Sequence, residues 1–364
     1  MYDYVIVGCG LYGSVFAHQL KKKGLKVIIL ERQSFPGGNV RSTQINDIHV
    51  HEYGPHIFHT QSKKIWEFVN SVSPFHHYQH KVKARYEDKI YTLPFNMSTY
   101  YEMWGCTTPQ EAIQELNKQR EKIKNPSNLE EQALSTIGKD LYQKLVYGYT
   151  KKQWQRDPKK LPASIIRRIP LRMNFNDNYF NDYYQGIPTK GYSHLIEELI
   201  DGVEVKLNCE FNLTNWQNLG RKLVYSGSLD ELFNYSLGHL EYRGLEFKTE
   251  KLKGDFQGCS QMNYTSEHVP HTRIIEHKHF QNTKLKDTIV TYEYPIEWSP
   301  GLTRYYPIND LKNKCLYEKY RHLIKKQERI IIGGRLGLNA YLDMDQVVAH
   351  AITTVNRELK LKCT

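Results

Sequence analysis

Three glycines near the N-terminus have a spacing that could hold phosphate groups. Gly8, Gly10 and Gly13 form a G-x-G-x-x-G pattern that follows a β-rich run at residues 3–7 and opens a helical pattern. In this context the first glycine permits a tight turn, the second lets the backbone approach a pyrophosphate, and the third lets helix and strand pack closely. The helix N-terminus adds free N–H donors and a positive dipole end. The pattern therefore predicts a dinucleotide site.

Further residues favour FAD over NAD at this site. The next apolar run ends in Glu31, whose carboxylate can accept hydrogen bonds from ribose hydroxyls. A second glycine turn, typical of flavoproteins, follows after four residues and contains Gly38 and Asn39. Near the C-terminus a strand-like run at 329–332, a glycine turn and a helical pattern over 345–359 form one more unit of this fold. Such a unit usually closes over the isoalloxazine, where the helix N-terminus can stabilise the negative charge of reduced flavin.

Two histidines three residues apart, His56 and His59, lie beside a Gly-Pro pair at residues 54–55. A metal site would need further ligands at a suitable spacing, so we predict none. A loop pressed against flavin fits better, because Gly-Pro fixes the turn and imidazole can hydrogen-bond flavin or sugar atoms. A purely structural loop is the alternative.

Aromatic and basic residues in the middle of the chain suit a nucleoside diphosphate. Tyr149 and Trp154 flank two lysines at the end of a helical pattern, and Arg168 precedes an Asn/Asp-rich stretch at 174–182 that contains Tyr179. Aromatic faces can stack a base, and arginine can bind phosphate through two parallel hydrogen bonds. An ordinary basic surface loop is the alternative.

Other polar residues lie near the C-terminal flavin segment. Residues 272–280 alternate apolar and charged side chains, as a strand should, and the inward charges would be costly unless paired with ligand. Tyr306 and Tyr341 add phenols close to this segment. Asp343 and Gln346, three residues apart, resemble a capping box that begins the last helix.

Length and composition set the class of protein. The chain has 364 residues, 40% hydrophobic and 24% charged, so we expect two or three packed lobes. The net charge of +11 favours anionic partners. Six scattered cysteines without a CxxC pair fit a reducing cytosol. The chain starts directly with a strand, and no apolar run approaches the roughly 20 residues that span a bilayer. We therefore expect a cytoplasmic protein without an integral membrane segment.

These elements predict an α/β protein with a Rossmann-like FAD-binding domain, an inserted helical lobe and an antiparallel β-sheet domain. The helical lobe includes patterns over 111–122 and 129–145, and residues 240–306 are strand-like. The FAD-binding domain is expected to be discontinuous, over 1–75, 190–235 and 325–364. The helical lobe is expected over 96–165, and the sheet domain over 76–95, 166–189 and 236–324.

Several of these motifs together resemble one family. The runs GPHIFHT (54–60), GYTKKQW (148–154), LPASIIRRIPLR (161–172), NYFNDYYQGIP (178–188) and TRIIEHKHF (272–280) occur in the order found in bacterial UDP-galactopyranose mutases. The likeness covers essentially the whole chain. The run at 299–304 is longer than the family pattern, which leaves the register between Tyr305 and Tyr306 open.

The resemblance implies an FAD enzyme, active when the flavin is reduced. It would interconvert UDP-galactopyranose and UDP-galactofuranose, or the N-acetylgalactosamine forms, by attack of the flavin on the anomeric carbon with no net redox. The product would supply cell-surface polysaccharide, and family members are commonly homodimers.

The resemblance also carries roles onto positions of this chain. The catalytic set is Arg168, Arg273, His56 and His59. The substrate-binding set is Tyr149, Trp154, Arg168, Tyr179, Arg273, Tyr306, Tyr341 and Asp343. The cofactor-binding set is Gly8, Gly10, Gly13, Glu31, Gly38, Asn39, His56, Gly227, Arg335, Asp343 and Gln346.

Two other classes of function remain as alternatives. The first is a redox flavoenzyme of the same architecture, such as an amine or sugar oxidase, which would transfer a hydride to an acceptor. The second is a basic protein that binds nucleic acid or a membrane surface. No helix-turn-helix, RNP or zinc pattern supports it, so we expect no nucleic-acid partner.

Overall fold

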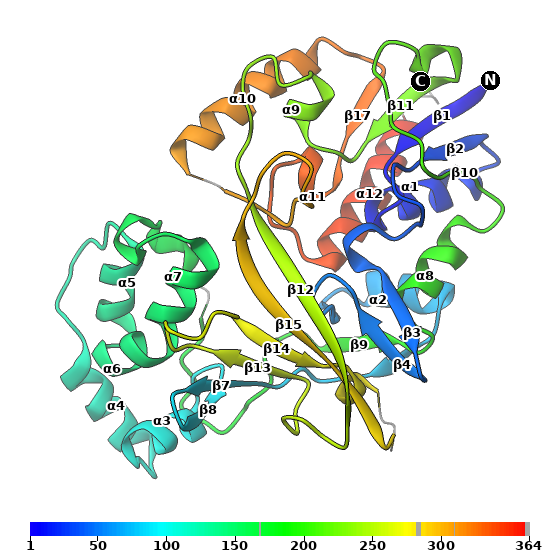
Figure 1. The fold of residues 1–364 in the computed structure, drawn as a ribbon. Helices are drawn as coiled ribbons and strands as arrows, with labels where there is room; N and C mark the ends of the chain where they lie inside the picture. The colour runs from blue at the N-terminus through cyan, green and yellow to red at the C-terminus, as the bar shows by residue number, and fades with distance from the viewer. Residues whose placement is uncertain (167–168, 282–284, 309, 361–364) are drawn as a thin grey trace.

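The computed structural model describes residues 1–166, 169–281, 285–308 and 310–360, and Figure 1 shows their arrangement. One lobe contains both termini, a long ribbon of strands runs through the middle, and a helical lobe lies beyond the ribbon. The arrangement confirms the predicted α/β class, with a Rossmann-like domain, a helical lobe and a largely antiparallel sheet.

The lobe with both termini is built on a five-stranded parallel sheet. Its strand order is β10 (Glu204–Lys206), β2 (Val27–Leu30), β1 (Tyr2–Val7), β11 (Gly220–Tyr225) and β17 (Ile330–Ile332). Segments from the start, middle and end of the chain therefore share one sheet. Because strand side chains alternate between faces, Tyr4 and Ile6 belong to one hydrophobic core while Val5 belongs to another with Trp216.

Helices cover both faces of this sheet. The first core packs beneath α1 (Leu11–Lys21), α8 (Gly191–Ile200) and α12 (Met344–Lys360). Another core joins β11 and β17 to α9 (Leu229–Leu232) and α10 (Leu311–Lys325). The short α11 (Gly334–Gly337) follows β17 directly.

A seven-stranded sheet connects this lobe to the helices beyond it. Its order is β16 (Tyr306–Pro307), β12 (Tyr242–Lys253), β15 (Asp287–Glu297), β14 (Arg273–Glu276), β13 (Gln261–Tyr264), β7 (Val82–Tyr86) and β8 (Lys89–Leu93). All neighbours are antiparallel except β13 and β7, which run parallel. The long β12–β15 ribbon forms the central part in Figure 1.

The helical lobe packs against β7 and β8 through its own core. It contains α3 (Met97–Trp104), α4 (Pro109–Gln119), α5 (Leu129–Thr136), α6 (Lys139–Leu141), a π-helical turn (Tyr142–Tyr147) and α7 (Gly148–Trp154). Smaller elements complete the fold: β3 (Ser42–Ile45) pairs with β4 (Ile48–His51), and α2 (Lys63–Val72) lies beside β5 (Phe58–Thr60), β6 (Phe75–His77) and β9 (Tyr184–Pro188).

Two segments differ from the expected division of the chain. Helix α10 packs on the parallel sheet, where Tyr320 stacks on Phe233 of the loop after α9 with ring centroids 6.1 Å apart. The segment 236–324 is therefore not one sheet unit. Strand β9 pairs with β5 and β6 rather than with the seven-stranded sheet, so residues 166–189 do not contribute a strand to that sheet in their described part.

Two predicted elements are also shorter than expected. The helix expected over 129–145 is interrupted after Thr136, and Gly138 has a φ of +81°. A Cβ at Gly138 would lie 2.5 Å from the side chain of Gln119, so glycine permits the break and the close contact. The strand expected over 272–280 ends at Glu276, and a 3-10 turn follows. None of the described helices is long and apolar enough to cross a membrane.

Candidate functional site

A cavity of about 580 Å³ lies where the parallel strands of the nucleotide lobe end. The turn after β1, the end of β2, the turn after β11 and the start of α11 all contribute to its wall. Ligands of open α/β sheets bind at the carboxyl ends of the strands, which is the edge that this cavity follows. The predicted cofactor residues that line it are Gly8, Gly10, Glu31, Gly38, Asn39, His56, Gly227 and Arg335.

The glycine turn has the geometry that its three positions require. Gly8 has a φ of +96°, which favours glycine. A Cβ at Gly13 would lie 2.0 Å from the Gly8 carbonyl oxygen, so Gly13 lets α1 pack against the turn and lies outside the cavity lining. A Cβ at Gly10 would meet no protein atom within 4 Å. The space in front of Gly10 is therefore open to a ligand, as a pyrophosphate cradle needs.

Glu31 is fixed at the end of β2 by two backbone donors. The N–H of Cys9 donates to Oε2 at 2.7 Å, and the N–H of Gln33 donates to Oε1 at 2.9 Å. Each carboxylate oxygen keeps a free lone pair, so Glu31 can still accept a hydrogen bond from a hydroxyl in the cavity.

The far end of the cavity is formed by the C-terminal unit. Arg335 donates from Nη2 to the carbonyl of Leu342 at 2.8 Å, and its guanidinium lies 5.0 Å from the centroid of the Tyr341 ring. The N–H of Asp343 donates to Oε1 of Gln346 at 3.0 Å, which is one half of the predicted capping box at the start of α12. Both of these residues lie outside the cavity lining, contrary to their predicted cofactor contact.

Next to Arg335 lies a cluster of one arginine and several phenols. The rings of Tyr306 and Tyr341 stack with centroids 5.4 Å apart. The charge of Arg273 influences Tyr149, Tyr179 and Tyr306, so each of these phenols lies within electrostatic range of its guanidinium. The structure thus brings five of the predicted substrate residues to one place, although they come from the helical lobe, the sheet and the C-terminal unit.

The register that the sequence left open resolves at Tyr306. Tyr306 stacks on Tyr341 and faces the cluster. Tyr305 is instead buried, and its ring packs against Tyr53 and Phe247.

Arg273 forms an ion pair with a carboxylate of the protein, that of Glu293. Its Nε and Nη2 donate to Oε2 of Glu293 at 2.7 and 2.6 Å, and Thr272 Oγ1 donates to the other carboxylate oxygen at 3.1 Å. Burial lowers the pKa of Arg273, but the Glu293 carboxylate and nearby phenols more than offset this, so the pKa is raised and the guanidinium stays charged.

The phenols of Tyr149, Tyr179 and Tyr306 remain protonated at neutral pH. Burial is the largest cause that raises the pKa of Tyr149, Tyr179 and Tyr306 above its ordinary value. Each hydroxyl can therefore donate a hydrogen bond to an anionic oxygen.

His56 joins the cavity to a group of buried histidines. Burial first, and then the positive charge of Arg335, lowers the pKa of His56 to about 3. Its backbone N–H donates to Nδ1 of His51, and the backbone N–H of His51 donates to Nδ1 of His277. Because both Nδ1 atoms are acceptors, each of these two rings carries its proton on Nε2, and both are neutral.

Two predicted residues, His59 and Trp154, have other contacts in the structure, and a third lies outside the described residues. His59 binds Asp182 at 2.6 Å through Nδ1 and stacks on Phe180 at 3.8 Å between centroids. Trp154 packs against the core of the helical lobe. Arg168 lies outside the described residues.

Two further residues of the site were not predicted. Glu293 was missed because it belongs to an ordinary alternating run, and only the β14–β15 register places it opposite Arg273. Lys152 was read with its neighbour as part of a basic motif, yet it is 8% exposed.

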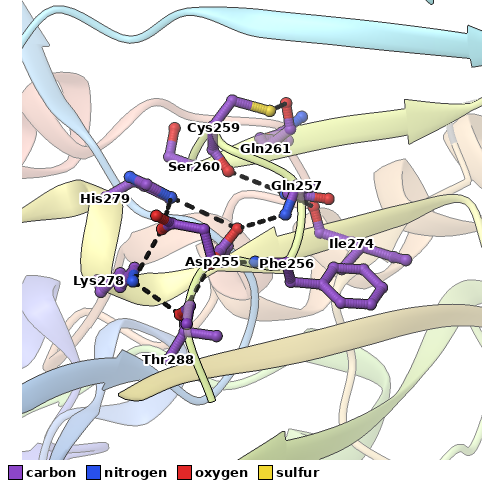
Figure 2. A network of polar contacts seen from close by, with 12 residues as sticks. Asp255, Phe256, Gln257, Cys259, Ser260, Gln261, Ile274, Lys278, His279 and Thr288 are labelled. Carbon is purple, nitrogen blue, oxygen red and sulfur yellow. Dashed lines mark hydrogen bonds and ion pairs between the residues drawn. The ribbon is translucent and has the colours of Figure 1, made fainter. Parts of the chain in front are cut away.

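One group of potential metal ligands lies away from this site. The ligand atoms of Asp255, Glu276 and His279 lie within 4.8 Å of one another. Figure 2 shows Asp255 facing Lys278 and His279, and the Lys278 ammonium lies 2.8 Å from Oδ1 of Asp255. Glu276 accepts from the N–H groups of residues 256 and 257. Because a lysine already supplies the cation, we interpret this group as an ion-pair network that fastens the turn before β13.

Comparison with known proteins agrees with this geometry. Residues 144–341 match the family model for UDP-galactopyranose mutase, and residues 6–72 match a model for an NAD(P)-binding Rossmann-like domain. A Klebsiella pneumoniae protein named "Probable UDP-galactopyranose mutase" is 40% identical, over 98% of this chain and 94% of the relative. An Escherichia coli dTDP-fucopyranose mutase is 36% identical, over 99% of each chain.

A solved structure shows the same fold. The crystal structure of a reduced UDP-galactopyranose mutase superimposes with a TM-score of 0.80, at 15% identity, over 99% of this chain and 94% of the other. With a family model that matches more than half of the chain and a relative 40% identical over nearly all of it, the chain belongs to the UDP-galactopyranose mutase family.

Proposed function

We propose that the chain is an FAD-dependent isomerase that interconverts UDP-galactopyranose and UDP-galactofuranose without net redox. One observation carries the proposal most directly. The dinucleotide cavity ends at His56 and Arg335, and the cluster of Arg273 and tyrosines begins beside the same Arg335. A flavin ring and a sugar diphosphate would therefore meet at this end of the cavity.

The residues present fit the dinucleotide portion of FAD. The open space at Gly10 accommodates the pyrophosphate beside the N-terminus of α1, and Glu31 is held where a ribose hydroxyl can reach it. The cavity continues from there to Arg335. When bound and reduced, the flavin would supply the nucleophile for the anomeric carbon of the sugar.

The polar cluster would hold the diphosphate of the substrate. Arg273 offers a fixed positive charge, and the hydroxyls of Tyr179, Tyr306 and Tyr341 can donate to phosphate oxygens. The ring of Tyr149 would stack on the uracil. Arg168, which lies outside the described residues, is proposed to complete this set as a second arginine that binds the diphosphate. We still propose His59 as a catalytic residue and Trp154 and Asp343 as substrate-binding residues, although His59 is paired with Asp182 and Trp154 packs in the helical lobe.

The experiment is conversion of UDP-galactofuranose by the purified protein, followed by chromatography with and without dithionite. Conversion to the pyranose form only with reduced flavin is the expected result. UDP-N-acetylgalactofuranose is tested in parallel. Flavin that is present but supports no conversion in either redox state would refute the proposal and favour an oxidase.

A second candidate substrate follows from the relatives. The dTDP-fucopyranose mutase is 36% identical, nearly as similar as the relative at 40%. The two ligand classes share the diphosphate, so the cluster around Arg273 fits both. Assay of dTDP-fucopyranose under the same conditions discriminates the two, since the preferred substrate has the higher kcat/KM.

We also propose that the enzyme is a cytoplasmic homodimer whose product supplies cell-surface polysaccharide. The family membership supports the role of the product. Light scattering on the purified protein measures the oligomeric state, and fractionation of cells measures the location.

A further inference from the structure

Lys152 is a buried cation at the boundary between the helical lobe and the seven-stranded sheet. Its side chain extends from α7 into the loop that joins β13 to β14. The ammonium donates to the carbonyls of Tyr264 at 2.7 Å, Val269 at 2.9 Å and His271 at 3.0 Å. Three donors meet three acceptors, so the ammonium is fully satisfied although no carboxylate contacts it among the hydrogen bonds of the described residues.

Lys152 connects the elements that carry two members of the polar cluster, Tyr149 and Arg273. Lys152 follows Tyr149 by three residues, which places both on neighbouring turns of α7. At the other end, His271 precedes Arg273 by two residues at the start of β14. The hydrogen bonds of Lys152 therefore connect the helix that carries Tyr149 with the strand that carries Arg273.

The fit between α7 and the loop is close elsewhere too. A Cβ at Gly148 would lie 2.3 Å from the carbonyl oxygen of Thr265 and 3.0 Å from the backbone nitrogen of Glu267. Glycine at this position lets the helix backbone touch the loop, and Lys151 forms an ion pair with Glu267 at the exposed edge. Lys152 is the buried part of this contact.

We propose that Lys152 is a positioning residue that sets the distance between Tyr149 and Arg273, and hence the width of the site for a nucleoside diphosphate. The inference rests on the proposed function, because it assigns the diphosphate to this cluster. Lys152 itself does not touch the substrate. The alternative is that Lys152 only stabilises the contact between the two lobes. This alternative predicts a lower free energy of unfolding without a specific loss of UDP affinity.

The groups around the ammonium support a strictly local role. Burial lowers the pKa of Lys152 to about 8. Burial, and then the charge of Lys152, lowers the pKa of the facing His271 to about 4, so this ring is neutral. The phenol of Tyr264 has a raised pKa, chiefly through burial, and is neutral as well. Glu267 is paired with Lys151 at the surface.

The test is the affinity of the oxidised, flavin-loaded protein for UDP, measured by calorimetry so that no turnover is needed. Lys152→Met keeps the length of the side chain but removes all three donors, and we expect UDP to bind at least about 10-fold more weakly, or about 1.4 kcal/mol. Lys151→Met is the matched control on the same helix, and we expect UDP affinity to stay within about twofold because exposed ion pairs contribute little.

A double-mutant cycle separates positioning from fastening. In the Tyr149→Ala background, Lys152→Met should have little further effect on UDP affinity, since the residue that it positions is gone. Equal effects of Lys152→Met in the two backgrounds, or unchanged affinity in the single variant, would overturn the inference. If Lys152→Met does not fold, Lys152→Gln, which keeps one side-chain amide donor, takes its place in the cycle. A wild-type protein that binds no UDP would instead contradict the proposed function itself.

Discussion

The carboxylate of Glu293 is the most informative single group to change. Glu293 lies directly opposite Arg273 in the β14–β15 register, and both N–H donors that reach it from Arg273 meet one oxygen at 2.6–2.7 Å. Glu293→Gln keeps the size of the side chain and removes the negative charge. The change leaves a guanidinium without its charged partner and with one fewer oxygen to orient it.

The magnitude follows from the burial of the pair. The side chain of Glu293 is 2% exposed and that of Arg273 is 16% exposed. Removing one partner of a fully buried pair costs about 3–5 kcal/mol. Arg273 retains some access to water and the glutamine oxygen can still accept one hydrogen bond, so we expect a loss of about 2 kcal/mol. For a chain of 364 residues this corresponds to a fall in melting temperature of roughly 3 °C.

The variant should also lose activity beyond what its stability explains. A misplacement of a catalytic group by about 1 Å can cost 10²-fold in rate, and Arg273 would lose its orienting partner. We expect turnover with reduced flavin to fall by about 10-fold to 100-fold at a temperature where the variant is folded. The flavin content should stay unchanged, since Glu293 does not line the dinucleotide cavity.

Asp287→Asn is the matched control, because Asp287 begins the same strand and forms an exposed ion pair with Lys251 at 2.9 Å. Its effect on stability should not exceed about 1 kcal/mol. The assays are thermal unfolding and conversion of UDP-galactofuranose. If Glu293→Gln melted and turned over like Asp287→Asn, the proposed role of the buried pair would be wrong.

Three further predictions follow from the same structure. Gly10→Ala should fold normally but bind FAD more weakly, whereas Gly13→Ala should lose soluble protein, because the added Cβ meets open space in the first case and the Gly8 carbonyl at 2.0 Å in the second; flavin content and yield measure the two effects, and equal yields would contradict the reasoning. The free energy of unfolding should fall as the pH drops from about 6.5 towards 3, because lowered pKa values keep His51, His56, His80 and His277 neutral in the fold while the unfolded chain binds protons. Urea midpoints between pH 7.5 and 5 measure this loss, which is up to about 1.4 kcal/mol per pH unit for each imidazole. A flat profile would refute the prediction. Arg273→Ala and Arg168→Ala should each lower turnover by about 10²-fold or more while FAD stays bound; wild-type activity in either variant would remove that arginine from the proposed diphosphate site.

The parts of the fold that sequence could predict are those set by local rules. The glycine turn at Gly8 and the helix after Asp343 follow from residues within one turn of each other. The prediction of one helix over 129–145 was wrong because the helical pattern of the sequence continues past Gly138, where the close contact with Gln119 requires a break. Gln119 and Gly138 are 19 residues apart in the chain, so this contact cannot be predicted from the residues next to Gly138.

The same distinction holds in the site. The tyrosines and Arg273 could be named from motifs, but their partners could not. Glu293 reaches Arg273 only through strand register, and Lys152 reaches His271 across 119 residues of chain. A one-residue change of register would move Glu293 to the other face of the sheet, away from Arg273.

The electrostatic design of the site follows from these long-range pairs. Arg273 and Glu293 together carry almost no net charge, the buried histidines are neutral, and Tyr149, Tyr179 and Tyr306 are protonated. Apart from Arg335 beside it, the described part of the cluster would thus offer a diphosphate mainly oriented donors rather than an excess of positive charge. A strong excess would bind substrate and departing UDP equally tightly, which lowers KM without raising kcat. Donors that are already oriented toward the position where negative charge develops stabilise the transition state instead. In this arrangement Glu293 keeps Arg273 fixed in direction and moderated in charge.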